Sequence, residues 1–373
     1  RVLDRDGGTV EDGRLTKLLA FRGLRRVPID SARAGDIVAV AGLGAATVAN
    51  TICEPDAVVA PIAAHPVDPP TLAMTFAVND SPLAGREGDK VTSRMIGARL
   101  RSEAEGNVAI RVSETADRDA FEVAGRGELQ LGILIETMRR EGYELSISRP
   151  RVLFRDDVET GQRLEPIEEV QIDVDQDYAG VVVEAMATRR AEVLGMEPSG
   201  GGRIRITVRA PTRGLIGYHG DFLSDTRGTG VMSRVFAGHA PHKGPIQGRR
   251  TGVLISNSQG AAVPYALWNL EERGSLFIGP GTAVYRGMII GEHARGNDLE
   301  VNPLKAKQLT NIRAAGKDDA VRLTPPRRLS LEQSLTYIAD DELVEVTPRS
   351  IRLRKSELDP HARKKQSRLK DVG

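Results

Sequence analysis

The chain has 373 residues, 40% hydrophobic and 28% charged, so it has the length for about two to four domains with hydrophobic cores. Its 52 Lys and Arg residues nearly balance 51 Asp and Glu residues, and the net charge of +1 excludes a global field that would attract polyanions. The single cysteine, Cys53, excludes a disulfide framework, and no apolar run reaches the roughly 18 residues of a membrane helix, so we expect a cytoplasmic protein without membrane contact.

Residues 1–66 have the pattern of a small β domain. Short apolar runs such as "TKLLAFRG", "RRVPID" and "GDIVAVAG" alternate with Gly, Asp and Pro turns. We predict a β-barrel, and because Arg1 stands inside a strand-like run we expect the barrel to be incomplete and the chain to be a fragment. The proline-rich stretch "EPDAVVAPIAAHPVDPP" that follows is typical of an extended linker.

Residues 70–150 alternate strand and helix patterns. The strand patterns lie at 71–80, 108–115, 119–125 and 143–150, and the helical patterns at 92–106 and 126–142. Four apolar residues of the second helix fall on one face: Leu131, Leu134, Ile135 and Met138. Gly142 supplies a stop signal for that helix. The order strand–helix–strand–strand–helix–strand predicts a ferredoxin-like α+β domain.

Residues 151–240 nearly repeat this order. Strands are predicted at 166–175, 200–211 and 230–238, and a helix at 177–197. Four residues of that helix are expected to face inward: Val182, Ala185, Met186 and Val193. The stretch "PTRGLIGYHGDFLSDTRGTG" at 211–230 takes the place of the second helix, which predicts a second ferredoxin-like domain.

The five glycines of 211–230 do not form a phosphate loop. The stretch contains no lysine, and nowhere does the chain match G-x-x-x-x-G-K-[ST]. We expect three glycines to allow close packing of a helix on a sheet and two to end it: Gly214, Gly217 and Gly220, then Gly228 and Gly230. Four side chains here are candidates for contacts with RNA: Arg213, Tyr218, His219 and Arg227. The alternative is that Tyr218 is a core residue and the arginines are merely solvated at the surface.

The sequence pattern changes again in residues 245–373, where mostly strand-like runs predict a mixed, strand-rich domain. A helical pattern runs from Val263 to Arg273, and Ser330 with Gln333 forms a capping-box pattern before a second helix. From Arg349 to Gly373 nine basic residues face three acidic ones, a local charge of +6. This tail is either a solvated surface or a phosphate-binding arm, with the following candidate contacts: Arg363, Lys364 and Lys365.

The segment 293–316 lacks apolar periodicity although core-forming patterns flank it. Long structureless loops in compact domains are usually functional or disordered. Six of its residues suit contacts with RNA backbone and base edges: Arg295, Asn297, Lys305, Lys307, Asn311 and Arg313. The residues alone leave an RNA-binding loop and a solvated loop equally open.

Residues that would carry catalysis or hold a cofactor are not recognisable. No Ser/His/Asp or Cys/His set emerges, and His239 and His242 lack a third ligand, so a solvated loop is the simpler interpretation. The sequence therefore predicts no catalytic, cofactor-binding or metal-binding residues.

Several motifs resemble a known family. The run "RRVPIDSARAGDIVAVAGL" resembles the second, β-barrel domain of translational GTPases, and "GRGEL" is shared with elongation factor G and LepA. The motifs "APTRGLIGYHGDFLSDTRGTG", "GVLISNSQG", "LTNIRAAGKDDAV" and "LTPPRRLSLEQSLTYIADDELVEVTP" resemble the TypA/BipA family of ribosome-associated GTPases. The resemblance covers nearly the whole chain.

The resemblance implies a multidomain α/β and β protein. It comprises a GTPase domain without counterpart here, a translation-factor barrel, two α+β domains similar to the third and fifth domains of elongation factor G, and a family-specific domain. GTP and Mg²⁺ would belong to the GTPase domain, so we expect no cofactor here, and we expect the chain alone to be inactive although the family hydrolyses GTP.

The resemblance also implies partners. They are the 70S ribosome and 50S subunit, rRNA and the acceptor end of A-site tRNA, which the loop matching 295–313 would approach. Family members are linked to large-subunit assembly and to stress and cold adaptation, and we expect a monomer. The alternatives are a regulatory protein-interaction or effector-binding module that binds no RNA, and an enzyme with an unrecognised site.

Overall fold

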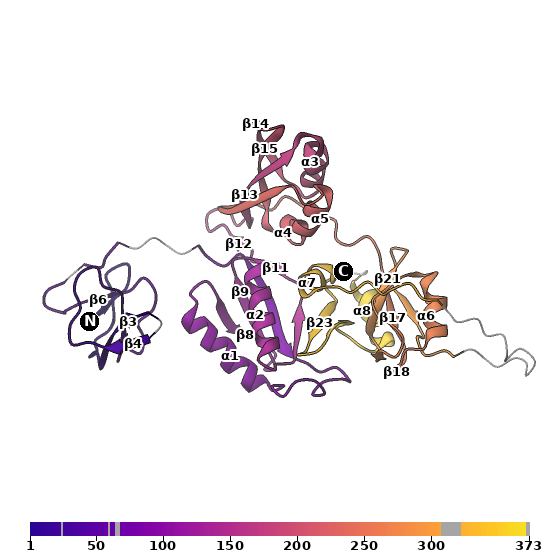
Figure 1. Ribbon diagram of the computed structural model, residues 1–373, viewed down its shortest axis with the longest axis horizontal. Coiled ribbons are helices and arrows are strands. Elements are labelled where there is room, and N and C mark those ends of the chain that lie inside the picture. Colours follow the sequence, from indigo (N-terminus) through magenta and orange to yellow (C-terminus); the bar gives the residue numbers. More distant parts are fainter. Residues whose placement is uncertain (24, 59, 64–67, 307–321, 371–373) are drawn as a thin grey trace, which may run out of the picture. The chain divides into compact units, whose positions relative to one another are not determined.

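The computed structural model describes residues 1–23, 25–58, 60–63, 68–306 and 322–370 (Figure 1). The chain divides into two compact units. Arg1–Asp68 with Glu105–Val108 form the first, and Pro69–Ala104 with Ala109–Gly373 form the second.

The first unit consists of short antiparallel strands. One sheet has the order β2-β1-β6, with β1 at Val2–Leu3, β2 at Thr9–Glu11 and β6 at Thr51–Ile52. The other has the order β4-β3-β5, with β3 at Lys17–Arg22, β4 at Arg25–Pro28 and β5 at Val38–Ala41. The expected β structure is therefore present. Among the described residues no strand pairing joins the two sheets, so the strands there do not close into a barrel.

The second unit begins with a ferredoxin-like order. The elements are β7 Leu72–Val78, α1 Ser93–Gly106, β8 Arg111–Glu114, β9 Ala120–Gly125, α2 Glu128–Arg140 and β10 Leu145–Ser148. Their sheet has the antiparallel order β10-β7-β9-β8. The four apolar residues predicted for one face of α2 are all buried, and Gly142 follows this helix with a φ of +95°. These predictions are confirmed.

A second ferredoxin-like order follows. The elements are β12 Arg155–Asp156, β13 Arg163–Asp175, α3 Ala179–Thr188, β14 Glu192–Gly200, β15 Arg203–Pro211, α4 Thr212–Leu215, α5 Tyr218–Asp225 and β16 Val231–Pro241. A 3₁₀ turn at Gln176–Tyr178 leads into α3. In the sheet β13 lies between β15 and β16, and β14 pairs with β15.

One predicted helix is too long. The helix expected at 177–197 ends at Thr188, and the chain turns at Arg190, whose φ is +63°. Val193 lies in β14 and is 42% exposed, whereas Val182 and Met186 are buried as expected. The apolar run after residue 190 pairs with β15, and Gly195 and Pro198 within it disfavour a helix.

The C-terminal region adds strands to the first of these two sheets. Its elements are β17 Val253–Ser256, β18 Gly260–Ala261, α6 Pro264–Glu271, β19 Gly274–Leu276, β20 Ala283–Val284, β21 Met288–His293, β22 Leu299–Val301, α7 Leu331–Tyr337, β23 Glu342–Val346, β24 Ile351–Lys355 and α8 Pro360–Lys370. β23 pairs antiparallel with β10, with Leu145 opposite Val346. The main path of the resulting 11-stranded sheet is β22-β17-β21-β24-β23-β10-β7-β9-β8, while β19 pairs with β21 and β11 (Arg151–Val152) pairs with β7.

One hydrophobic core follows this shared sheet. It contains Phe76 and Leu131 from the first ferredoxin-like region together with Val344 and Leu353 from β23 and β24. The predicted segments 70–150 and 245–373 thus share strands and core. The capping box before α7 is confirmed, because Ser330 Oγ accepts from the Gln333 N–H and the Gln333 side chain accepts from the Ser330 N–H.

Candidate nucleic-acid interface

The glycine-rich stretch folds as two short helices. Gly217, with a φ of +74°, separates α4 from α5, and its N–H donates to Glu128 Oε2 at 3.0 Å. A Cβ on Gly214 would lie 2.6 Å from the carbonyl oxygen of Arg189, the C-cap residue of α3, so the packing is close but is against that helix end and not against the sheet as predicted. A Cβ on Gly220 would meet nothing within 4 Å, so the packing role predicted for Gly220 is wrong. Gly228, at φ +78°, follows α5 as expected.

Two of the four side chains predicted to face RNA in this stretch are turned inward. The Tyr218 ring is fully buried beside Phe222, with the Arg189 guanidinium 4.3 Å from its centroid. Burial raises the pKa of Tyr218 to about 12. The Arg213 side chain is 15% exposed and forms a two-point ion pair with buried Glu165. Tyr218 therefore belongs to the core and offers no stacking surface, and the Arg213 charge is neutralised internally.

The other two side chains remain accessible. His219 and Arg227 are both exposed, His219 on α5 and Arg227 in the turn after it. Arg227 adopts a left-handed φ of +50°, and no acidic side chain pairs with it in the described part of the chain. These two residues stay as candidates for a contact with a polyanion.

The described candidates in 295–313 do not gather at one place. Arg295 and Asn297 are exposed in the turn between β21 and β22, which the Gly252 N–H holds by donating to the Arg295 carbonyl at 2.7 Å. β22 then runs parallel to β17, so exposed Lys305 lies beyond the opposite end of β17. Lys307, Asn311 and Arg313 lie outside the described residues.

Three cations of the basic tail are neutralised by acidic residues, some of them far away in sequence. Arg352 pairs with Glu87 and Glu345, and buried Arg354 pairs with Asp80. Buried Lys355 contacts three carboxylates: Asp298 at 2.6 Å, Asp341 at 2.9 Å and Glu342 at 2.9 Å.

Arg363 is held in the same way, and its predicted RNA contact is corrected. Its side chain is 14% exposed, pairs with Glu300 and donates to the carbonyl oxygens of Glu357 and Leu358. Lys364 and Lys365 are exposed on α8. The +6 of the tail therefore overstates the positive charge that faces solvent.

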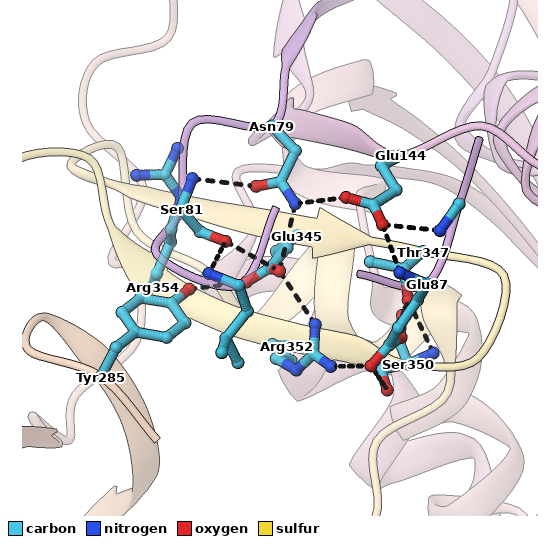
Figure 2. Close-up of polar contacts among 12 residues, drawn as sticks. Asn79, Ser81, Glu87, Glu144, Tyr285, Glu345, Thr347, Ser350, Arg352 and Arg354 are labelled. Atoms are coloured by element: carbon cyan, nitrogen blue, oxygen red, sulfur yellow. Dashed lines mark hydrogen bonds and ion pairs between the residues drawn. The ribbon is translucent and has the colours of Figure 1, made fainter. Parts of the chain in front are cut away.

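A buried polar network, which sequence reasoning missed, joins the C-terminal region to the first ferredoxin-like region. Figure 2 shows the fully buried Glu345 carboxylate at its centre. Its Oε1 accepts from Asn79 at 3.2 Å, Ser81 at 3.0 Å and Arg352 at 2.9 Å, and its Oε2 accepts from the Tyr285 hydroxyl at 2.6 Å. Burial, together with the Glu345 charge, raises the pKa of Tyr285, which keeps the hydroxyl a donor.

A second buried carboxylate fixes the loop after β7. Glu144 accepts from three backbone N–H groups of this loop: Gly85 at 2.7 Å, Glu87 at 2.9 Å and Gly88 at 2.7 Å. Burial would raise the pKa of Glu144, but these donors outweigh it and hold the pKa below its ordinary value.

We name these linked residues the junction network: Asn79, Ser81, Glu87, Glu144, Tyr285, Glu345 and Arg352. It satisfies its buried charges with hydrogen bonds and forms a structural joint between the two regions. In "YELSIS" and "LVEVTP" the two central glutamates alternate with apolar residues as solvent-facing strand residues would, so no local signal marks them as buried.

Neither a metal site nor a membrane-spanning helix is found among the described residues. The described residues contain no group of three or more His, Cys, Asp or Glu placed to hold a metal ion. Within the described part of the chain, no helix has the length and apolarity needed to cross a membrane.

Residues 162–250 indicate the general class of protein to which the chain belongs. These residues match the family model described as elongation factor G C-terminus, which is a translation-factor module. Residues 251–360 match the model described as TypA/BipA C-terminal domain, immediately after it. The chain belongs to the TypA/BipA family and corresponds to the C-terminal portion of its members.

Similar proteins are found in several organisms. The chain is 49% identical over 368 residues, 98% of its length, to the protein named "Large ribosomal subunit assembly factor BipA" of Salmonella typhimurium, of which it covers 60%. It is 51% identical to the protein of the same name from Haemophilus influenzae, and 48% identical to that from Bacillus subtilis, covering 59% of each. The chain thus spans about three-fifths of the length of the curated relatives that it matches.

Proposed function

We propose that this chain is the ribosome-contacting portion of a large ribosomal subunit assembly factor of the TypA/BipA type. The observation that carries the proposal is about 49% identity over 98% of the chain to proteins that bear that name. At this level the match includes the C-terminal module as well as the elongation-factor-like one. The 50S subunit and the 70S ribosome are accordingly the proposed partners.

The proposed contact with rRNA rests on exposed cations without an acidic partner. Arg227, Arg295, Lys305, Lys364 and Lys365 are exposed, and none has an acidic partner among the residues that the structure describes. Cations of this kind bind phosphates and release counterions, which makes binding strong at low salt and weak at high salt. A net charge of +1 restricts such binding to these local surfaces.

The junction network supports a role as a rigid arm. It fixes the C-terminal region to the first ferredoxin-like region through buried, hydrogen-bonded charges. A rigid joint limits the freedom lost when both regions contact one large partner, and preorganisation of this kind favours binding. We further propose that the C-terminal region approaches the acceptor end of A-site tRNA, and that the role extends to stress and cold adaptation in the cytoplasm.

Co-sedimentation tests this function. The chain should migrate with 50S subunits and 70S ribosomes in sucrose gradients at low salt, less so at high salt, and not with 30S subunits alone. Replacing Arg295 and Lys305 together with Ala should lower the log–log salt slope by about 0.7–0.9 for each phosphate that the chain no longer neutralises. The matched control is Arg205→Ala, because Arg205 is exposed but already paired with Asp173. Absence of ribosome binding at every salt concentration would refute the proposal.

Catalysis is not proposed for this chain. GTP and Mg²⁺ would be bound by a GTPase domain, and no residue here is assigned to them. Pure chain should therefore show no steady-state GTP turnover, and turnover that tracks the protein through purification would contradict that expectation.

A further inference from the structure

Helix α6 is anchored at both ends and along one face. Leu267 is part of the core of the C-terminal region, and Ala266 beside it is also buried. At its start the Val263 N–H donates to the Pro303 carbonyl at 3.0 Å, and at its end Glu271 accepts from the Thr324 N–H at 2.6 Å. The helix is therefore tied at its start to Pro303, which follows β22, and at its end to Thr324.

The opposite face of α6 presents aromatic side chains to solvent. Trp268, the only tryptophan of the chain, is 48% exposed although Trp is usually well buried. Tyr265 precedes it by one turn and is half-buried, and the two ring centroids lie 6.3 Å apart with an interplanar angle of 38°. A single exposed aromatic needs no explanation, but this one belongs to a pair on a helix whose other face is fixed.

Exposed cations stand at both ends of this aromatic pair. Lys305 follows Pro303, which receives the hydrogen bond at the start of the helix. Arg273 comes two residues after the end of α6. Arg322 comes two residues before Thr324, whose N–H donates to Glu271 in the last turn of α6. All three are exposed and lack an acidic partner within the described ranges, whereas one acid, Glu272, shares the aromatic face one turn after Trp268.

We propose that Trp268, supported by Tyr265, is a stacking platform for an unpaired base of RNA, with the three cations contacting the flanking phosphates. The inference deepens the proposed function and rests on it. Proteins that bind single-stranded RNA combine aromatic faces, on which bases stack, with cations along the backbone. Two acids, Glu271 and Glu272, lie at the end of the helix, and Glu271 already accepts from the Thr324 N–H. The excess of three cations over two acids favours a polyanion over an acidic peptide. The Glu272 carboxylate repels phosphate, so it weakens binding, and we expect no phosphate contact on its side of the aromatic pair.

The sole tryptophan makes the test direct. Titration of the full chain with single-stranded oligo(A) should quench Trp268 fluorescence and protect it from acrylamide, whereas inorganic polyphosphate should bind without quenching because it has no bases. With a labelled oligo(A), Trp268→Ala should weaken binding at least about fivefold and Trp268→Phe should restore most of it. Glu272→Gln should tighten binding, and Leu129→Ala, at a 60% exposed position on α2, is the matched control and should change nothing.

The outcomes separate this inference from the proposed function. If oligo(A) leaves the fluorescence unchanged while the chain still migrates with 50S subunits, the stacking platform is refuted and ribosome binding stands. Quenching by 50S subunits but not by oligo(A) or by deproteinised rRNA would assign the surface to a ribosomal protein and overturn the inference. Loss of both signals would refute the proposed function itself. Unchanged melting temperatures of the variants exclude unfolding as a cause.

Discussion

The two ferredoxin-like regions have the same strand order and different surroundings. In the first, the last strand β10 pairs with β7 on one side and with β23 on the other. In the second, the last strand β16 pairs with β13 and, among the described residues, with no strand on its other side. The same topology therefore has two uses. The first region shares its sheet and core with the C-terminal region, whereas the second region has a core of its own.

The two regions differ at the outer edge of their last strand, which is β10 in the first region and β16 in the second. The outer edge of β10 is covered by a strand from nearly 200 residues further on, and buried carboxylates lock the contact. The edge strand β16 instead carries a register shift opposite Ile167 and Glu168, and a glycine at φ +113°, Gly238. Bulges and irregular geometry discourage further pairing, which suits a module that is not extended by the same chain.

Core truncation is the largest expected effect and tests whether the first region and the C-terminal region unfold together. Phe76→Ala and Phe222→Ala each remove a fully buried ring and should cost about 3–5 kcal/mol. By hydrogen–deuterium exchange, Phe76→Ala should reduce protection in β23 and β24 as well as in β7, because one core spans them. Phe222→Ala should reduce protection mainly in β13–β16. Unchanged β23 and β24 in the Phe76 variant would show that the shared sheet is not one cooperative unit.

Removal of one hydroxyl gives a smaller and more specific contrast. Tyr285 and Tyr218 are both fully buried, but only the Tyr285 hydroxyl has a partner among the described residues, the Glu345 carboxylate at 2.6 Å. Tyr285→Phe should cost about 1.5–3 kcal/mol, since a hydrogen bond to a buried charge is removed. Tyr218→Phe should be neutral or slightly stabilising. Urea unfolding measures both, and equal costs would mean that the junction network adds nothing specific.

Sequence patterns predicted the elements better than they predicted the joint. Helix α2 and the α7 cap follow from local periodicity and local hydrogen bonding, so four apolar residues and one Ser–Gln pair were sufficient. The pairing of β10 with β23 depends on residues far apart in the chain, and no local rule selects that partner.

The candidate site was predicted less well, for the same reason. Tyr218 has a polar tip that suits either core or surface, and Arg363 is neutralised by Glu300, 63 residues away. Charge counted along a sequence cannot reveal such pairing. Trp268 was overlooked because its neighbours Ala266 and Leu267 are core residues, and only the fold separates the two faces of α6.

Acid should weaken the joint through its carboxylates. The pKa of Glu144 and that of Glu87 are held below the ordinary value of about 4.5, so both groups bind fewer protons folded than unfolded. Their stabilisation is complete above that pH and is lost as the pH falls towards their lower folded pKa. Glu144→Gln should therefore lower the free energy of unfolding at pH 7 and flatten its decline below about pH 4.5. A parallel decline in wild type and variant would exclude Glu144 as a source.

The smallest effect is expected at the β16 edge. Val235 is 64% exposed and lies opposite Glu169 on β13. Val235→Lys should change the free energy of unfolding by no more than about 0.5 kcal/mol, because a surface residue is replaced and a cross-strand charge pair partly compensates for the packing of the valine side chain. Sedimentation velocity should show monomer before and after the change. A wild-type dimer that the lysine dissociates would mean that a second copy covers this edge, and the two ferredoxin-like regions would then differ only in whether the covering strand comes from the same chain.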